Sequence, residues 1–456
     1  MLIDADNPYR GDFPARLELT AEDFSFDLSE TNRQALGRTA AWSVVGYLAA
    51  DCNLAPLMFE DLKEMKAVGS GPDLHVMALF DGSLLTDAFF ARLHRTSKLS
   101  EDLLAKFGEL ETHKPEVLTL ALQLAGFYPG EKRVLFLSGH GQGWRGALLD
   151  ENRGLTRYRR DPEWLVLPGT YEECFRGLRE CNRQVQEELN RHLPAPAPAK
   201  PYDIVAFDAC YMGNIEAVAT LAEQADFLVV TEDQMPGQGF PYGRLLAALA
   251  KDPKQPPETF CRLLVAETKD FYHLPGRPRS RVTQAALRSK SLPEVIAALC
   301  RLVQDLSSLL DGDPAVRQAT SYTLDKAYYF TDTDSIDIKD MVLNLLACPL
   351  PVELRQAAEA FLDAWSAMVV ATSAPEEGGG RHGLAIYAPR PEKFDLAYLR
   401  LANTLPYGLG IWSWFLARYY LLVLGEEAPR HPLIRAIEDT MADMIRQGLY
   451  HPPGHR

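Results

Sequence analysis

The sequence has few cysteines and no long apolar run, and these two absences narrow what the chain can be. Its 456 residues include 7 cysteines, an odd number, and no two of them form a CxxC pair. This usage excludes a disulfide scaffold and a typical zinc site, and it is typical of a protein from a reducing compartment. No apolar stretch approaches the roughly 18 residues that a spanning helix needs, so we expect no membrane span.

Positive charge is also scarce. The chain carries 47 Lys and Arg residues against 62 Asp and Glu residues, which gives a formal net charge of −15. Without a basic excess the chain lacks the electrostatic footprint of a nucleic-acid binder, so we expect no nucleic-acid partner. The N-terminal residues lack the basic segment and apolar core of a secretory signal. We therefore expect a cytoplasmic protein and leave secretion by another route open.

Short apolar runs alternate with helical patterns over residues 41–250, which we expect to form the catalytic core. The apolar runs, each typical of a strand buried on both faces, are 42–50, 74–80, 133–138, 203–207 and 227–231. Strands that alternate with helices predict an α/β fold with a mostly parallel sheet flanked by helices. In such sheets the chemistry gathers beyond the carboxyl ends of the strands.

Three other regions flank or interrupt this core. Residues 1–40 are polar and contain several turn formers, which predicts an irregular N-terminal arm. Residues 151–202 form an insert with four arginines close together near its start, at 153, 157, 159 and 160, and a proline-rich linker. Residues 251–456 are mainly helical in pattern, with one apolar run at 383–388 that could add a strand.

A histidine and a cysteine follow two of the predicted strands at equivalent positions. His140 comes directly after the strand at 133–138, in Ser-Gly-His-Gly-Gln-Gly-Trp, and Cys210 follows the strand at 203–207, in Asp-Ala-Cys-Tyr-Met-Gly-Asn. If these strands are neighbours, the two side chains converge at one edge of the sheet. A nearby imidazole and the N-terminus of a following helix both favour a thiolate. We therefore predict that Cys210 is a nucleophile and His140 its general acid.

Each of these residues also has a plainer interpretation. Cys210 could be an inert core thiol, and His140 could be a structural histidine in a glycine turn. The motifs around them favour the catalytic interpretation. In that case the backbone N–H groups of Gly141 and Cys210 are the candidates for an oxyanion hole.

Taken in order, the motifs resemble those of the clostripain-type cysteine peptidases, which belong to the caspase-like clan. The matching segments are 42–54, 138–144, 208–214 with Glu216, and 232–242, with weaker matches at 336–340 and 383–387. The resemblance implies a caspase-like fold, a dyad of Cys210 and His140, and hydrolysis of peptide bonds after Arg or Lys. It also implies activation by cleavage within the insert at 151–202.

The resemblance further implies a carboxylate that binds the basic side chain of the substrate. Asp208 is the first candidate for this substrate-binding role, and Glu232 and Asp233 are further candidates. Such a carboxylate pairs with Arg or Lys and disfavours an acidic residue, so cleavage after Asp is not expected. Asp208 could instead cap a turn or helix, and Glu232 and Asp233 could be solvated strand-end charges. Gln238, in the same region, offers no charge to a basic side chain.

The predicted mechanism needs no organic cofactor, and the expected partner is a peptide or protein substrate with Arg or Lys before the scissile bond. Calcium assists some members of the clostripain type, but Asp332, Asp334 and Asp337 lack the glycine and terminal glutamate of a calcium loop. Two other functions stay open at this point. One is an inactive caspase-like scaffold that binds a partner protein, and the other is a thiol amidase or acyl transferase that acts on a small substrate.

Overall fold

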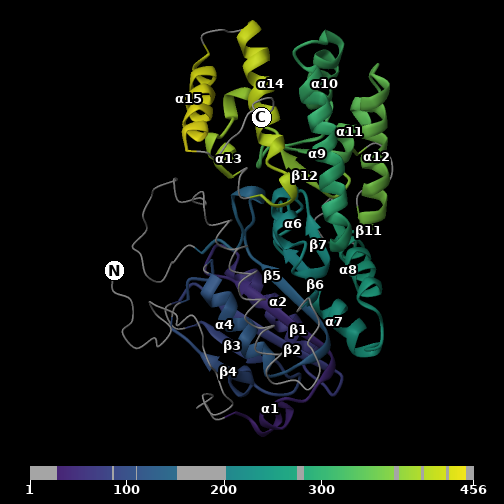
Figure 1. Ribbon diagram of the computed structural model, residues 1–456. Helices are drawn as coiled ribbons and strands as arrows, with labels where there is room; N and C mark the ends of the chain where they lie inside the picture. Colours follow the sequence, from purple (N-terminus) through teal and green to yellow (C-terminus); the bar gives the residue numbers. More distant parts are fainter. Residues whose placement is uncertain are drawn as a thin grey trace. The chain divides into compact units, whose positions relative to one another are not determined.

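The described part of the chain divides into two compact units (Figure 1). The computed structural model describes residues 28–447, with gaps at 85–86, 109, 114, 151–201, 275–281, 374–378, 402–404 and 428–430. Unit 1 takes in the described residues of Met1–Gly213, Leu221–Ser289 and Val370–Ala374. Unit 2 takes in those of Asn214–Thr220, Lys290–Val369 and Pro375–Arg456. The insert predicted at 151–202 lies outside the described residues except for Tyr202, which begins a strand.

Unit 1 is built on a nine-stranded sheet with the order β11-β8-β7-β6-β5-β1-β2-β3-β4. Its strands are β1 (Ala40–Ala49), β2 (Leu74–Asp81), β3 (Phe89–Arg92), β4 (Leu103–Lys106), β5 (Gly130–Ser138), β6 (Tyr202–Asp208), β7 (Ala225–Thr231), β8 (Gln284–Arg288) and β11 (Val369–Thr372). The five central strands, from β2 to β7 in the sheet order, pair in parallel. The prediction of a mostly parallel sheet flanked by helices is therefore confirmed.

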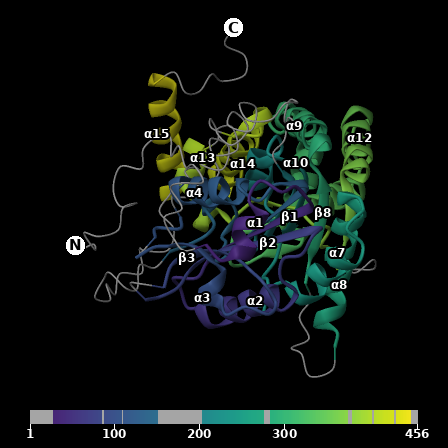
Figure 2. The same ribbon diagram turned by 90° about the horizontal axis from the view of Figure 1, so that it is seen from below.

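Helices cover both faces of this sheet. They are α1 (Glu30–Ala35), α2 (Ala55–Val68), α3 (Leu99–Asp102), α4 (Pro115–Gly126), α7 (Tyr242–Lys251) and α8 (Pro257–Tyr272), with a 3₁₀ turn at Gly143–Arg145. Figure 2 shows α4 on the opposite side of the sheet from α2. Helix α1 falls within the segment predicted as an irregular arm, and it begins there because Ser29 accepts the Asn32 N–H at 3.4 Å as an N-cap.

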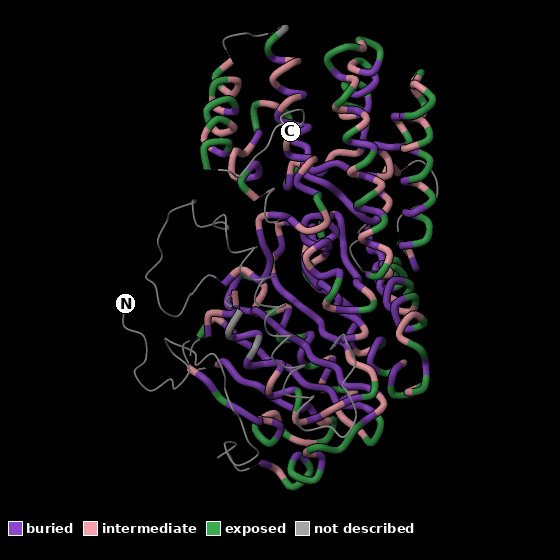
Figure 3. Tube along the Cα trace, in the orientation of Figure 1, coloured by how far each residue is buried: buried purple, intermediate pink, exposed green. Residues whose placement is uncertain are grey.

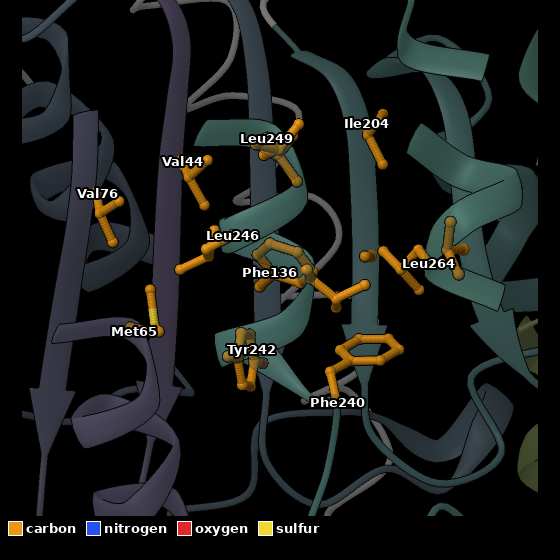
Figure 4. Close-up of a cluster of buried hydrophobic side chains, with 14 of the residues drawn as sticks. Val44, Met65, Val76, Phe136, Ile204, Phe240, Tyr242, Leu246, Leu249 and Leu264 are labelled. Atoms are coloured by element: carbon orange, nitrogen blue, oxygen red, sulfur yellow. The ribbon is translucent and has the colours of Figure 1, made fainter. Parts of the chain in front are cut away.

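The central strands are buried along almost their whole length (Figure 3). On the face covered by α2, α7 and α8, alternate strand residues such as Val44, Phe136 and Ile204 point into one apolar cluster (Figure 4). The ring of Phe136 lies with its centroid 5.7 Å from that of Phe240 and 5.2 Å from that of Tyr242. Burying a ring of this size contributes about 1.5–3 kcal/mol, so the cluster anchors the segment that leads into α7.

Unit 2 is mainly helical. Its helices are α6 (Ile215–Leu221), α9 (Leu292–Leu309), α10 (Pro314–Lys326), α11 (Ile338–Leu346), α12 (Val352–Met368), α13 (Leu396–Leu401), α14 (Ile411–Glu427) and α15 (Pro432–Arg446). A small antiparallel sheet joins β9 (Tyr329–Phe330), β10 (Ser335–Asp337) and β12 (Ala385–Tyr387), so the apolar run at 383–388 contains a strand. Helix α8 and strand β8 lie beyond residue 250 but belong to unit 1, because β8 pairs with β7. Among the described helices, none has the length and apolarity needed to cross a membrane.

Candidate active site

The two strands that precede His140 and Cys210 are neighbours. β5 and β6 run in parallel, with Ser138 opposite Asp208 as the last pair of their ladder. His140 and Cys210 each follow two residues beyond that pair, so both lie at the carboxyl edge of the sheet in unit 1. The neighbouring strands that the dyad prediction required are therefore present.

Gly141 brings the histidine loop against the cysteine loop. A Cβ added to Gly141 would lie 2.3 Å from the carbonyl oxygen of Cys210 and 3.0 Å from the side chain of Met212. These distances are too short for any side chain, so glycine is required for the close approach of the two backbones. The two residues predicted to supply the oxyanion-hole N–H groups thus lie next to each other.

A short antiparallel bridge fixes the histidine loop. The Leu148 N–H donates to the carbonyl of His140 at 2.8 Å, and the Gln142 N–H donates to the carbonyl of Gly146 at 2.9 Å. Neither of these two bonds uses the Gly141 N–H. The bridge therefore holds the loop without engaging the amide that was predicted to bind an oxyanion.

Cys210 is half-buried, and its sulfur contacts the backbone of the segment that follows β7. The Met235 N–H donates to Cys210 Sγ at 3.3 Å, and Sγ lies 3.6 Å from the Met235 carbonyl oxygen. The N–H directed at the sulfur favours the thiolate, whereas the bond in which the thiol donates to the carbonyl favours the neutral thiol. The helix expected after Cys210 is α6, which begins at Ile215, five residues later in the chain.

His140 is half-buried, and its imidazole contacts a residue from a third strand end. His140 Nε2 lies 2.6 Å from Asn53 Oδ1. Asn53 follows β1, which is the neighbour of β5 on the side away from β6. The sequence pattern placed Asn53 in a matching segment but assigned it no role. Its position in the loop that follows the buried strand β1 was the signal that could have identified it.

Asp208 is 5% exposed, and its carboxylate binds the turn that precedes α7. Asp208 Oδ2 accepts hydrogen bonds from the Phe240 N–H and the Tyr242 hydroxyl, each at 3.0 Å. Gly239 has a φ of +59°, and a Cβ there would lie 2.4 Å from the same oxygen. Glycine is therefore needed at 239 both for the left-handed backbone and for room beside the carboxylate. These contacts hold the turn, and the substrate-binding role of Asp208 stays a prediction.

A second buried carboxyl group, Asp61 on α2, interacts electrostatically with Asp208. Burial, together with the negative charge of Asp208, raises the pKa of Asp61 to about 9. Burial also raises the pKa of Asp208, but the hydrogen bonds from Phe240 and Tyr242 oppose this and the value is about 6. At neutral pH Asp61 therefore keeps its proton while Asp208 is mainly ionised. Sequence reasoning missed Asp61 because it is a single acid among the apolar positions of α2.

Glu232 and Asp233 lie beside the loop that follows Cys210. Glu232 is 1% exposed, and a Cβ on Gly213 would lie 2.6 Å from its backbone nitrogen. The Asp233 carbonyl accepts the Tyr211 N–H at 3.0 Å, and its carboxylate accepts the Gln234 N–H at 2.8 Å. The structure thus brings both acidic residues to the same sheet edge as Cys210, and their substrate-binding role stays a prediction.

The acidic residues considered for calcium have other partners in unit 2. Asp334 accepts hydrogen bonds from the Tyr329 hydroxyl at 2.6 Å and from Lys393 at 2.8 Å. Asp337 caps α11 by accepting the Asp340 N–H at 2.7 Å. Within the described ranges, no group of three or more His, Cys, Asp or Glu side chains is placed to hold a metal ion.

Comparison with known proteins agrees with this geometry. The family model of the clostripain family, Peptidase_C11, matches residues 170–346. No curated protein matches the sequence significantly. Among solved structures, the fold is similar to a secreted C11 cysteine protease from Bacteroides thetaiotaomicron in complex with an irreversible peptide inhibitor, with a TM-score of 0.58, 18% identity and coverage of 82% of this chain and 99% of that chain.

A second similar structure is an inactive zymogen C11 protease from Parabacteroides distasonis, with a TM-score of 0.52, 17% identity and coverage of 82% of this chain and 98% of that chain. Because both identities are low, these two structures show a similarity of fold alone. The similarity in sequence rests on the family model. Together they confirm the resemblance to the clostripain-type peptidases and the caspase-like α/β fold. The similarity to the clostripain family indicates that the chain is a cysteine peptidase, and therefore a hydrolase.

Proposed function

We propose that the protein is a cysteine endopeptidase that hydrolyses peptide bonds after Arg or Lys. The observation that carries this proposal is the pair of strand ends on β5 and β6, with His140 on one, Cys210 on the other, and Gly141 packed against the Cys210 carbonyl. Asp208 lies at the base of the same loop as Cys210, two residues before it.

The reaction proceeds in two steps. Cys210 Sγ attacks the carbonyl carbon of the scissile bond, and the N–H groups of Gly141 and Cys210 donate to the developing oxyanion. His140 gives a proton to the leaving amine, and a thioester to Cys210 remains. Water then attacks the thioester with His140 as the base, which releases the acid product and restores the thiol.

The electrostatics behind Cys210 support selection of a basic side chain. Asp208 is mainly ionised at neutral pH, and both of its hydrogen bonds go to Oδ2, so Oδ1 is the oxygen that would accept an Arg or Lys donor. Asp61 stays protonated, so the pair presents about one negative charge and not two. Glu232 and Asp233 add acidic character at the same sheet edge.

Internal cleavage belongs to the same proposal. The insert at 151–202 connects β5 to β6, the two strands that carry the dyad, and its arginines at 153, 157, 159 and 160 fit the proposed preference. These arginines lie outside the described residues. Intact-mass analysis of purified wild type tests the idea, because fragments ending at one of these arginines, absent from Cys210→Ala, are the expected result.

A panel of matched fluorogenic peptides ending in Arg, Lys, Asp or Asn tests the activity. We expect cleavage after Arg and Lys, with kcat lowered roughly 10⁴-fold or more in Cys210→Ala. Cys300→Ala is the matched control, because Cys300 is partly buried in unit 2 and contacts the Gly408 carbonyl at 3.5 Å. Cleavage after Asp would contradict the role of Asp208.

Two further outcomes separate the alternative functions. Hydrolysis of a glutamine-like amide with no peptide cleavage would indicate a thiol amidase. No hydrolysis of any substrate, before or after limited tryptic cutting of the insert, would indicate a scaffold.

A further inference from the structure

The imidazole of His140 has two nitrogens, and one of them, Nε2, contacts Asn53. Nε2 lies 2.6 Å from Asn53 Oδ1, a normal distance for a bond in which the ring N–H donates to the amide oxygen. The hydrogen bond made by one ring nitrogen fixes which tautomer the ring adopts. With its proton on Nε2, the neutral ring presents an unprotonated Nδ1.

The fold holds Asn53 firmly at this place. β1 pairs with β5, with Leu48 opposite Ser138, so the loop after β1 emerges beside the histidine loop. Cys52, the residue before Asn53, is 1% exposed, and its N–H donates to the Ala50 carbonyl at 2.7 Å. Leu54, the residue after it, is the N-cap of α2. Asn53 is thus an exposed side chain on a backbone fixed on both sides, by a buried cysteine and by the start of a helix.

We propose that Asn53 is a positioning residue for the reaction: its Oδ1 accepts a hydrogen bond from the Nε2–H of His140 and so directs Nδ1 toward Cys210 and the leaving group. This inference rests on the proposed function, because it assigns a partner to the base of the dyad. During catalysis Nδ1 takes the thiol proton and later gives it to the leaving amine. Nε2 keeps its own proton throughout, so no proton passes to Asn53.

An amide suits this role better than a carboxylate because it accepts a hydrogen bond without adding charge. Asn53→Asp keeps the acceptor but introduces a negative charge 2.6 Å from the ring, which would stabilise the imidazolium. Asn53→Ala removes the acceptor and lets the ring rotate. The two variants therefore separate the orienting effect from the electrostatic effect.

The first test is kinetic and uses the Arg peptide across a range of pH. In Asn53→Ala we expect kcat to fall about 10-fold to 100-fold with little change in KM, because a misaimed base slows the chemical step. In Asn53→Asp we expect a smaller loss and an upward shift of the pH–rate profile by about one pH unit. The matched control is Asn344→Asp, since Asn344 lies on α11 and its amide donates to the Asp340 carbonyl. An unchanged kcat in Asn53→Ala would overturn the proposal.

The second test does not depend on activity. Long-range ¹H–¹⁵N NMR of the histidine rings reports the tautomer of His140, assigned by comparison with His140→Ala. We expect the Nε2–H tautomer in wild type and a mixture of tautomers in Asn53→Ala. If Asn53→Ala changes the tautomer of His140 as expected but the wild type cleaves no peptide, the Asn53 contact is supported and the proposed function is refuted. If peptides are cleaved and the tautomer of His140 is the same in Asn53→Ala as in wild type, the proposed function is supported and the positioning role is refuted.

Discussion

Unit 1 buries two clusters of ionisable side chains, and they accommodate charge in opposite ways. The acidic cluster comprises Asp61, Asp208 and Tyr242, and it lies behind the loop of Cys210. Each of these side chains is uncharged when it is protonated, and burial raises the pKa of each. Only Asp208, which accepts two hydrogen bonds, stays mainly ionised at neutral pH.

The arginine cluster comprises Arg92, His75, His94 and Asn32, and it lies along β2, β3 and α1. Arg92 is 3% exposed and keeps its charge, although burial lowers its pKa to about 10. Its guanidinium lies 2.9 Å from His94 Nε2, and it donates to His75 Nδ1 and Asn32 Oδ1, each at 3.2 Å. Burial, with Arg92 as a further cause, lowers the pKa of both histidines to about 4, so they stay neutral.

The difference shows how each cluster relates to function. Burial favours the neutral form of an acid, as in Asp61, whereas an arginine keeps its charge when buried and needs hydrogen-bond acceptors around it. The acidic cluster touches the turn beside Cys210, whereas in the described part of the chain the hydrogen bonds of the Arg92 side chain go to His75, His94 and Asn32. Changes in the first should therefore alter activity, and changes in the second should alter only stability.

Within the two clusters, the largest expected effect comes from removing the charge of Asp208. In Asp208→Asn we expect kcat/KM for the Arg peptide to fall about 100-fold to 1,000-fold, the cost of losing one partner of a buried charge pair. Arg92→Met is the counterpart in the arginine cluster. It should leave kcat/KM unchanged and lower the free energy of unfolding by about 2–4 kcal/mol, because the Arg92 hydrogen bonds are lost. Equal effects of both variants on kcat/KM would remove the distinction between the clusters.

The next effect concerns the pH dependence that Asp61 imposes on stability. Between its unfolded pKa of 3.8 and its folded pKa of about 9, the folded state holds a proton that the unfolded state has lost. Stability therefore falls as pH rises through this range. Asp61→Asn mimics the protonated acid and should reduce that loss by about 3 kcal/mol between pH 6 and pH 8.5. Urea unfolding of both proteins at the two pH values measures it, and parallel curves would contradict the buried neutral acid.

His75 should give the opposite slope. At pH values between its unfolded pKa of 6.5 and its folded pKa of about 4, His75 is protonated in the unfolded state and neutral in the folded state. Stability therefore falls as pH drops. His75→Gln keeps an acceptor for Arg92 and cannot titrate, so wild type should lose about 2 kcal/mol more than the variant between pH 7 and pH 5. A variant that is equally acid-sensitive would show that His75 is not the titrating group.

The smallest effect is expected outside both clusters. Arg301 pairs with Asp305 on α9 at 3.1 Å, but the arginine side chain is 72% exposed. Arg301→Ala should change the free energy of unfolding by less than about 0.5 kcal/mol, and salt should reduce even that. Denaturant unfolding at low and high salt measures this change, and the changes caused by variants of the two buried clusters are compared with it.

The sequence predicted the central sheet well because parallel strands are buried on both faces. The apolar runs that became β1, β2, β5, β6 and β7 are near-continuous, so the signal is local. The shorter strands β3, β4, β8 and β11 pair at the sides of the sheet, and their runs are too short to stand out. His140 and Cys210 could be identified from the sequence for the same reason, since each follows a strand with a clear apolar run.

The two clusters were not accessible from sequence because they depend on long-range contacts. Asp61 and Asp208 are separated by 147 positions, and nothing local to α2 indicates that Asp61 faces another acid. The contact between Asn53 and His140, which belongs to neither cluster, likewise spans 87 positions, so the loop position of Asn53 does not show which side chain it meets. A pattern shows where a strand ends, but which strand ends become neighbours is a property of the sheet order.

The most direct test of Cys210 as the nucleophile of a site selective for basic residues is covalent labelling with an arginyl chloromethyl ketone, read by peptide mass spectrometry. We predict one adduct, on Cys210, formed more slowly in His140→Ala and in Asp208→Asn. The aspartyl analogue should label at least about 100-fold more slowly. An adduct on Cys300 or Cys348 at a comparable rate, or equal labelling of Cys210 by the arginyl and aspartyl reagents, would contradict this assignment.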